Sequence, residues 1–357
     1  MKLDTVIQRI PYWYAAGKSV HLKSAPGRGK TTTIEGAPKQ LSERTHKNIG
    51  MVIINGAMLT PMDVLGYGIP KHHDTGHSSM VFTDPFFWVT REGKRLTEYD
   101  GGIVFVDEAD KADVDVKKVL GEGALSGRFG PHKLPPGWIM WSAGNRTEDR
   151  SGSTKELDHL INRRMEIDIT DDLESLTNWM TKNSVSPLTI AFSNSNPQIV
   201  LAEKVPDKQG PWCTPRSMVQ ADQYMQLVAS ENNGQFQDDS TIVEEVAGMI
   251  GQGSAAQFFA SVRLEREMPK FDKIIADPTK CKIPEKPDAQ MLVCYTLAHR
   301  VSKETASPVI TYVERMPKEF AVTFAKAACN RDASLVTTQA FNKWALNNAS
   351  LMAAIAR

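Results

Sequence analysis

The sequence has no apolar stretch as long as a membrane span, and its amino-terminal segment lacks the apolar core of a signal peptide. Its 42 lysines and arginines equal its 42 aspartates and glutamates, so the chain lacks the overall basic character of many nucleic-acid binders. Internal repeats and low-complexity tracts are also missing. These absences argue against a membrane protein and a repeat protein, and we expect a cytoplasmic location.

Cysteine is scarce as well. The four cysteines, Cys213, Cys281, Cys294 and Cys329, are far apart and show no close pair of the kind that binds zinc. We therefore expect free thiols in a reducing compartment. The 357 residues exceed what one compact core usually holds, so two or three domains are expected.

What the sequence does contain is a glycine-rich segment near its start, Ser-Ala-Pro-Gly-Arg-Gly-Lys-Thr at residues 24–31. Its glycines let backbone N–H groups crowd an anion, while the lysine can reach the β- and γ-phosphates and the threonine hydroxyl can bind Mg²⁺. An apolar strand is expected before it and a helix after it. Ser24 stands where the P-loop pattern has its first glycine. The candidate phosphate-binding residues are Ala25, Pro26, Gly27, Arg28, Gly29, Lys30, Thr31 and Thr32.

A second motif is the apolar run from Gly102 to Val106 that ends in Asp107 and Glu108. Such a run predicts a buried parallel strand whose carboxyl end faces a ligand. Asp107 can support Mg²⁺, and Glu108 can polarise a water molecule for attack on the γ-phosphoryl group. The acidic pair favours hydrolysis over phosphoryl transfer to a small molecule.

A third apolar run, residues 138–145, ends in the polar amide of Asn145. We expect it to lie between the two strands just described, where Asn145 could hold the attacking water or a γ-phosphate oxygen. Arg163 and Arg164 follow, and Arg216 lies at an expected helix start. Arginine suits planar contact with phosphate through several donors.

With these pieces in order, the chain resembles the AAA+ ATPases, and within them the MoxR branch. Two segments carry the MoxR likeness: residues 56–66 lead into an insertion, and residues 127–138 precede the third run as a hairpin would. Ala143-Gly144-Asn145-Arg146 and Asn162-Arg163 also fit the sensor 1 and arginine-finger patterns of that branch. The resemblance covers residues from about 5 to 260.

The resemblance implies a site that binds ATP and Mg²⁺ and hydrolyses the nucleotide. Lys30 and Thr31 would bind phosphate and metal, Asp107 would support the metal, Glu108 would be the catalytic base, and Asn145 would be sensor 1.

It also implies assembly into a ring, usually a hexamer, in which Arg163 enters the neighbouring subunit's site, with Arg164 as the second choice. Arg216 would be the sensor 2 arginine. The resemblance implies ATP-driven remodelling of a protein client, with a von Willebrand factor A domain protein as a partner. The alternatives are a nucleic-acid translocase or helicase-like motor, and a scaffold that binds ATP but turns it over slowly.

The expected fold is α/β: an AAA+ P-loop core with a five-stranded parallel sheet, then a helical lid and C-terminal helices. The core is expected over residues 1–170, the lid over 171–265 and a C-terminal helical extension over 266–357. Residues 271–287, rich in Lys, Asp and Pro, predict a linker or irregular loop. The five strands are expected at 20–23, 51–54, 103–106, 139–143 and 165–169.

The insertion at residues 66–77 contains His72, His73, Asp74 and His77. These residues could bind a metal or sense pH. The plainer interpretation is a solvated loop of a ring pore that contacts a substrate or partner. The aromatic residues just beyond it, Phe82, Phe86, Phe87 and Trp88, are expected in the core, with a surface that grips a client as the alternative.

Overall fold

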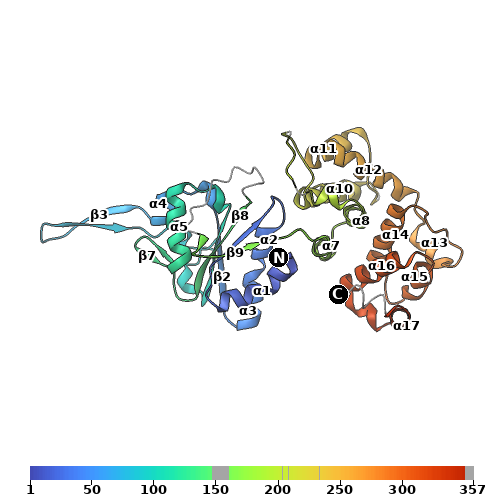
Figure 1. The fold of residues 1–357 in the computed structure, drawn as a ribbon, viewed down its shortest axis with the longest axis horizontal. Coiled ribbons are helices and arrows are strands. Elements are labelled where there is room, and N and C mark those ends of the chain that lie inside the picture. Colours follow the sequence, from blue (N-terminus) through green and yellow to red (C-terminus); the bar gives the residue numbers. More distant parts are fainter. Residues whose placement is uncertain (147–160, 203, 208, 233, 350–357) are drawn as a thin grey trace. The chain divides into compact units, whose positions relative to one another are not determined.

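The computed structural model describes residues 1–146, 161–202, 204–207, 209–232 and 234–349. The chain divides into two compact units, Met1–Asp172 and Leu173–Arg357 (Figure 1). The first unit is α/β, and in its described residues the second contains helices and no strand. No helix within the described residues is long and apolar enough to cross a membrane.

A five-stranded parallel sheet forms the centre of the first unit, and its strand order is β2-β5-β8-β1-β9. All five predicted strands are present, each within two residues of its expected ends, and β8 lies between β5 and β1 as predicted. The α/β fold class is therefore confirmed. The strands are β1 (Val20–Ser24), β2 (Ile49–Asn55), β5 (Gly101–Asp107), β8 (Trp138–Asn145) and β9 (Met165–Asp168).

The central strand β5 shows why the sheet is buried on both faces. Its residues alternate between two hydrophobic clusters: Ile103 and Phe105 belong to one, and Val104 and Val106 to the other. Side chains of a strand point alternately to opposite faces, so an unbroken apolar run is suited to a sheet covered on both sides.

Helices cover both faces of this sheet. The cluster containing Ile103 includes buried residues of α1, α2 and α3, while the cluster containing Val104 includes residues of α4 and α5. The helices are α1 (Leu3–Ala15), α2 (Lys30–Glu35), α3 (Ala37–Thr45), α4 (Pro61–Leu65) and α5 (Val114–Ser126), with 3₁₀ turns η1 (Gly56–Met58), η2 (Phe86–Trp88), η3 (Leu96–Glu98) and η4 (Ala109–Lys111).

Two hairpins interrupt this plan. The expected hairpin before β8 is present as β6 (Arg128–Phe129) and β7 (His132–Lys133). The insertion, expected as a loop, is instead an antiparallel hairpin of β3 (Gly68–His72) and β4 (Ser78–Phe82) that projects from the unit (Figure 1). All ten of its strand residues are exposed.

The expectation that the four aromatic residues after the insertion are core residues is only half right. Phe87 and Trp88 are buried and pack edge-on against Phe129, with ring centroids 5.2 and 5.7 Å away. Phe82 and Phe86 are 38% and 58% exposed. Phe82 lies on the projecting hairpin, and of the two adjacent phenylalanines in η2 only Phe87 faces the interior.

The second unit is a helical assembly around one hydrophobic core that extends from Met180 to Trp344. Apolar residues at helical spacing predict helices near 174–181, 216–229, 289–301 and 318–329, and all four are present. The elements are α7 (Leu173–Lys182), α8 (Pro187–Ser195), α9 (Pro197–Val200), α10 (Pro215–Glu231), α11 (Ser240–Ile250), α12 (Gln252–Arg266), α13 (Phe271–Ala276), α14 (Pro287–Arg300), α15 (Ala306–Val313), α16 (Lys318–Arg331), η6 (Ala333–Thr337) and α17 (Gln339–Asn347).

The predicted linker at 271–287 is wrong in its first part, which forms α13. Phe271, Ile274 and Ile275 share one face of this helix and pack on the core, and Ile274 is 1% exposed. The sequence pattern also predicts a terminal helix over 338–356. Helix α17 covers Gln339–Asn347 of it, and residues 350–356 lie outside the described residues. The division between lid and extension at residue 265 stays a prediction.

Candidate functional site

The glycine-rich segment connects the end of β1 to the start of α2, as expected. Gly27 and Gly29 have φ angles of 74° and 76°, in the left-handed region that glycine adopts without a steric penalty. The backbone path therefore favours glycine at both positions. Arg28, between them, is 8% exposed, and its Nε lies 3.0 Å from a carboxylate oxygen of Asp171 in the same unit.

Ser24, which replaces the first glycine of the pattern, does not distort this loop. It is fully buried, and it is absent from the described non-glycine residues with positive φ. Its hydroxyl donates to the carbonyl oxygen of Ala25 at 2.9 Å. A glycine is thus not needed at this position of the backbone.

Lys30 connects the loop to the neighbouring strand β8. The side chain is largely buried, and Nζ donates to Ser24 O, Ser24 Oγ and Asn145 Oδ1 at 3.1, 3.0 and 3.0 Å. Strand pairing sets Ser24 directly beside Asn145. The structure therefore brings together the predicted phosphate-binding lysine and the predicted sensor amide, which are 115 residues apart in sequence.

Thr31 is joined in the same way to β5. Its hydroxyl donates to Asp107 Oδ2 at 2.5 Å, and Asp107 Oδ1 accepts the backbone N–H of Glu108 at 2.9 Å. A hydroxyl and a carboxylate oxygen are hard donors, and Mg²⁺ is usually held by one or two carboxylates together with waters and phosphate oxygens. The donor set of Thr31 and Asp107 fits that ion.

Glu108, the predicted catalytic base, has an unusual backbone and an ionic partner. Its φ of 51° and ψ of 35° place a non-glycine residue in the left-handed region, where strain often accompanies a functional position. One carboxylate oxygen lies 2.7 Å from Nζ of Lys111. Lys111 was missed from sequence, although an acid and a base three residues apart are a recognisable signal.

Asp110 and Lys117 form a buried polar group behind the site, and both were missed from sequence. Each is 2% exposed. Burial raises the pKa of the Asp110 carboxyl, and the backbone N–H of Asn145 partly opposes this effect. Lys117 Nζ donates to the backbone oxygen of Asp110 at 2.8 Å. Adding a Cβ at Gly144 would bring it within 2.8 Å of Asp110 Oδ1, so this packing requires a glycine next to Asn145.

The two predicted finger residues differ in accessibility. Arg164 has a side chain that is 9% exposed, and it pairs with Glu166 at 3.3 Å within its own unit. Arg163 is 29% exposed and lies 3.6 Å from Glu122. Both arginines thus pair with carboxylates of their own unit.

Arg216 belongs to the second unit, where it is exposed in the first turn of α10. Thr214 caps this helix, since its hydroxyl accepts the backbone N–H of Ser217 at 3.1 Å. The expected helix start is therefore confirmed.

The histidines of the hairpin bond to neighbouring hydroxyl groups. His72 and His73 pair with Ser78 and Ser79 at 2.7 Å, and His77 pairs with Thr75 at 2.6 Å. Across the described ranges of the chain, no group of three or more His, Cys, Asp or Glu side chains could hold a metal ion. The structure thus gives no support to the metal-binding interpretation of the insertion.

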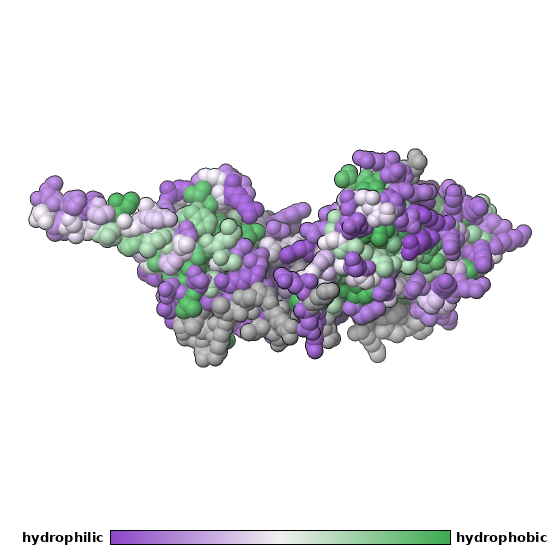
Figure 2. Space-filling model, turned by 90° about the horizontal axis from the view of Figure 1, so that it is seen from above, coloured by the Kyte–Doolittle hydropathy of each residue, from purple (hydrophilic) through white to green (hydrophobic). Residues whose placement is uncertain are grey.

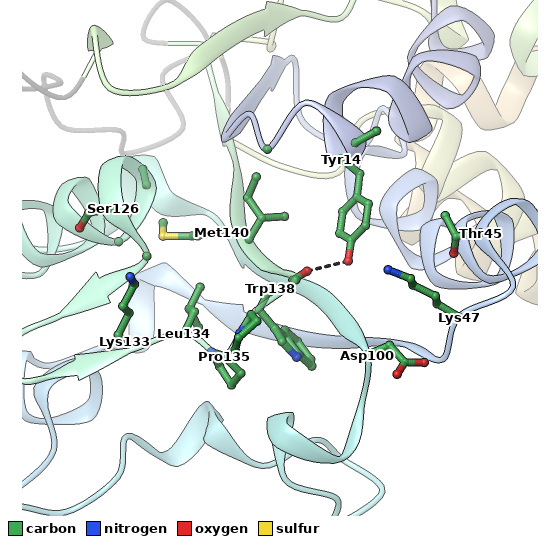
Figure 3. Close-up of a pocket in the computed structure, with 18 of the residues that line it drawn as sticks. Tyr14, Thr45, Lys47, Asp100, Ser126, Lys133, Leu134, Pro135, Trp138 and Met140 are labelled. Carbon is green, nitrogen blue, oxygen red and sulfur yellow. Dashed lines mark hydrogen bonds between the residues drawn. The ribbon is translucent and has the colours of Figure 1, made fainter.

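A separate cavity of about 760 Å³ lies at the opposite edge of the sheet, where β8 begins (Figure 3). It is lined by the ends of α1, α3 and α5 and by residues 133–140. Tyr14 extends into it and donates a hydrogen bond to Gly137 O at 2.6 Å. The cavity is distinct from the cluster around Lys30, which follows the carboxyl end of β1.

No protein-family model and no curated protein matches this sequence. Solved structures resemble it at low identity. A candidate ATPase from Cytophaga hutchinsonii is 14% identical over 70% of this chain and 81% of its own, with a TM-score of 0.35. The Holliday junction branch migration motor RuvB of Thermotoga maritima is 13% identical over 78% and 75%, with a TM-score of 0.40. NtrX from Brucella abortus is 14% identical over 91% and 67%, also with a TM-score of 0.40.

These likenesses concern the fold. Function is therefore inferred from the residues of this chain and their geometry.

Proposed function

We propose that this chain is a Mg²⁺-dependent ATPase of the AAA+ type. The observation that carries the proposal is the pair of hydrogen bonds at the carboxyl ends of three adjacent strands: Lys30 to Asn145, and Thr31 to Asp107. Together they bring a phosphate-binding cation, two oxygen ligands and a polar amide to one edge of a parallel sheet. Ligands bind at this edge in open α/β folds.

In the proposed reaction, water attacks the γ-phosphorus and the bond to the β–γ bridging oxygen breaks, which gives ADP and phosphate. Lys30 binds the β- and γ-phosphate oxygens, Glu108 accepts a proton from the attacking water, and Asn145 orients that water. Thr31 and Asp107 would hold Mg²⁺, which neutralises phosphate charge when bound. The remaining loop residues, from Ala25 to Thr32, would surround the phosphates with backbone N–H groups.

We further propose that activity depends on assembly of several copies of this chain into a ring, and that this ring is a hexamer. Arg163 is the better candidate for the finger that enters the neighbouring site, because it is more exposed than Arg164, which is enclosed beside Glu166. Arg216, exposed at the start of α10, is the proposed sensor 2 residue. An arginine supplied by a neighbour can contribute about 10³–10⁵ in rate.

The cellular role we propose is MoxR-type remodelling of a protein client, with a von Willebrand factor A domain protein as partner. A nucleic-acid motor is the second candidate, and one observation favours it. Arg128 and Lys133 are paired across the β6–β7 hairpin and both are exposed, so they give it a local positive charge. Binding to DNA or RNA that weakens steeply with salt would support the second role.

The deciding experiment measures ATPase rate against protein concentration, with sedimentation, for the wild type, Glu108→Gln and Arg163→Ala. We expect specific activity to rise with assembly, and both variants to assemble without turnover. Asp115→Asn is a control, since it removes one exposed carboxylate of α5. An ATPase rate that is independent of concentration and of Arg163 would refute the shared site. Failure of Glu108→Gln to slow turnover would refute the assigned base.

A further inference from the structure

The projecting hairpin, residues 66–83, is here called the arm. Its strand residues are all exposed, and an isolated two-stranded hairpin is at best marginally stable in water. It nevertheless carries large apolar side chains that are exposed, and Figure 2 shows hydrophobic residues on it among hydrophilic ones. Exposed apolar surface of this kind indicates an interaction site. These side chains are Tyr67, Ile69, Met80, Val81 and Phe82, and they are 38–60% exposed.

The hydrogen bonds at the two ends of the arm determine which backbone groups face outward. Thr83 N–H donates to Tyr67 O, and His73 N–H donates to His77 O, both at 3.0 Å. Bonded and non-bonded pairs alternate along an antiparallel ladder, so the register fixes the pairs between them. The pairs whose N–H and C=O groups point away from the partner strand are Gly68 with Phe82, Pro70 with Met80 and His72 with Ser78.

The two outer edges of the arm therefore differ. On β3 the central outward residue is Pro70, which has no N–H to donate, and Lys71 adds a charge. Proline and lysine are devices that keep sheet edges from pairing with other chains. On β4 the sequence Ser-Ser-Met-Val-Phe contains neither proline nor charge. Its outer edge offers the N–H and C=O groups of Ser78, Met80 and Phe82.

We propose that the outer edge of β4 adds a strand from an extended, uncharged polypeptide segment that carries apolar side chains. This makes the arm the element that holds a protein client, and in that respect it depends on the proposed function. Met80 and Phe82 share one face of the arm and both lie over Gly68, where they offer an apolar surface beside the new strand. Main-chain hydrogen bonds supply affinity that does not depend on the client's sequence.

The size of the edge favours a client segment over a second copy of this chain. Five residues span only about 17 Å, and one added strand buries far less than the roughly 1,200–2,000 Å² of a stable protein interface. A contact of this size suits weak binding of a client that is released in each round of ATP hydrolysis. Since β4 carries no charge, a charged segment would gain no ionic partner in return for its desolvation.

The test uses the full chain and a fluorescent ten-residue peptide of alternating threonine and valine. We expect the peptide to slow amide hydrogen exchange at Ser78, Met80 and Phe82, with no added protection at Ser79 and Val81. Met80→Pro removes an outward N–H without removing a ladder bond, and it should weaken peptide binding at least tenfold. Met80→Ala keeps that N–H and should weaken binding less.

The matched control is His72→Pro. It removes an outward N–H from the outer edge of β3, which already contains Pro70, and should leave peptide affinity unchanged. Equal affinity of the wild type and Met80→Pro would overturn the proposal. Protection that rises with protein concentration in the absence of peptide, together with dimers in sedimentation, would assign the edge to a second copy and overturn the client. ATP hydrolysis measured on the same samples separates the two proposals: peptide binding as described without any turnover would leave strand addition standing and refute the ATPase.

Discussion

The ammonium group of Lys111 lies 2.7 Å from a carboxylate oxygen of Glu108, the residue proposed to activate water. The two side chains are 29% and 37% exposed, and a pair so accessible to solvent contributes at most about 1 kcal/mol. The interaction is strong enough to bias the orientation of the carboxylate and weak enough to be broken when nucleotide binds.

We therefore expect Lys111→Met to raise basal turnover by up to about fivefold, the factor that corresponds to about 1 kcal/mol. Steady-state ATPase kinetics measure the effect. Lys118→Met is the matched control. Lys118 forms an ion pair of the same spacing, three residues apart, with Asp115 at 2.8 Å on the surface of α5. A fall in turnover for Lys111→Met alone would show that Lys111 assists the reaction.

A second prediction separates chemistry from binding at Asn145. Asn145→Ala should lower kcat by about 10²–10³-fold, as removal of one positioned polar group does in other active sites. ATP affinity should change little, because Lys30 keeps its two contacts to Ser24. Fluorescent nucleotide titration and single-turnover kinetics measure the two quantities. An equal loss in affinity and rate would make Asn145 a binding residue.

Gly29 and Gly17 allow a test of the phosphate-binding loop. Both have positive φ, 76° and 62°, and neither would bring a new Cβ within 3.4 Å of another group. Alanine at either position should destabilise the first unit by about 1–2 kcal/mol through backbone strain. Only Gly29→Ala should also weaken ATP binding. Urea unfolding and nucleotide titration of both variants provide the comparison, and equal affinities would exclude the loop from the site.

The adjacent phenylalanines of η2 should differ in stability effects. Phe87 is fully buried, so Phe87→Ala should lower the free energy of unfolding by about 3–5 kcal/mol. Phe86 is 58% exposed, and Phe86→Ala should change it by less than about 0.5 kcal/mol. Urea unfolding of the two variants tests the assignment. A large loss for Phe86→Ala would mean that its ring is covered in solution.

The buried carboxyl of Asp110 predicts a pH dependence of stability. Burial raises the pKa of Asp110 from its ordinary value of 3.8, so the folded state binds this proton more tightly than the unfolded state does. The contribution of this group to stability must then fall as pH rises from that value through the higher pKa of the folded state. Asp110→Asn cannot titrate, so its stability relative to the wild type should increase over that range. A constant difference across pH would contradict the assignment.

Strands β2, β5 and β8 were predictable as short, largely apolar runs, and β5 shows the reason: both of its faces are buried. The shorter strands β1 and β9 instead alternate apolar with polar residues. The placement of β8 between β5 and β1 followed from the resemblance, since spacing alone does not determine strand order. Thr31 and Asp107 could be paired in advance for the same reason.

Other features depended on three-dimensional packing. The positive φ of Glu108 is one of them, because non-glycine residues rarely adopt the left-handed region and no propensity predicts it here. The arm was taken for a loop because Pro70 and Lys71 interrupt any strand pattern, and because neither face is buried. Helix α13 was missed because flanking lysines and prolines concealed its short apolar face.

Gly66 fixes the place where the arm leaves helix α4, since any Cβ there would lie 1.9 Å from the carbonyl oxygen of Thr83. Beyond that point the ten strand residues are exposed and do not pack on the core. Adding one residue to each strand would extend the arm by about 3.3 Å and leave Lys30 and Asp107 in place. The arm is thus an exchangeable module, and its reach and its gripping edge can diversify, in evolution or in the laboratory, while the site that would power it stays constant.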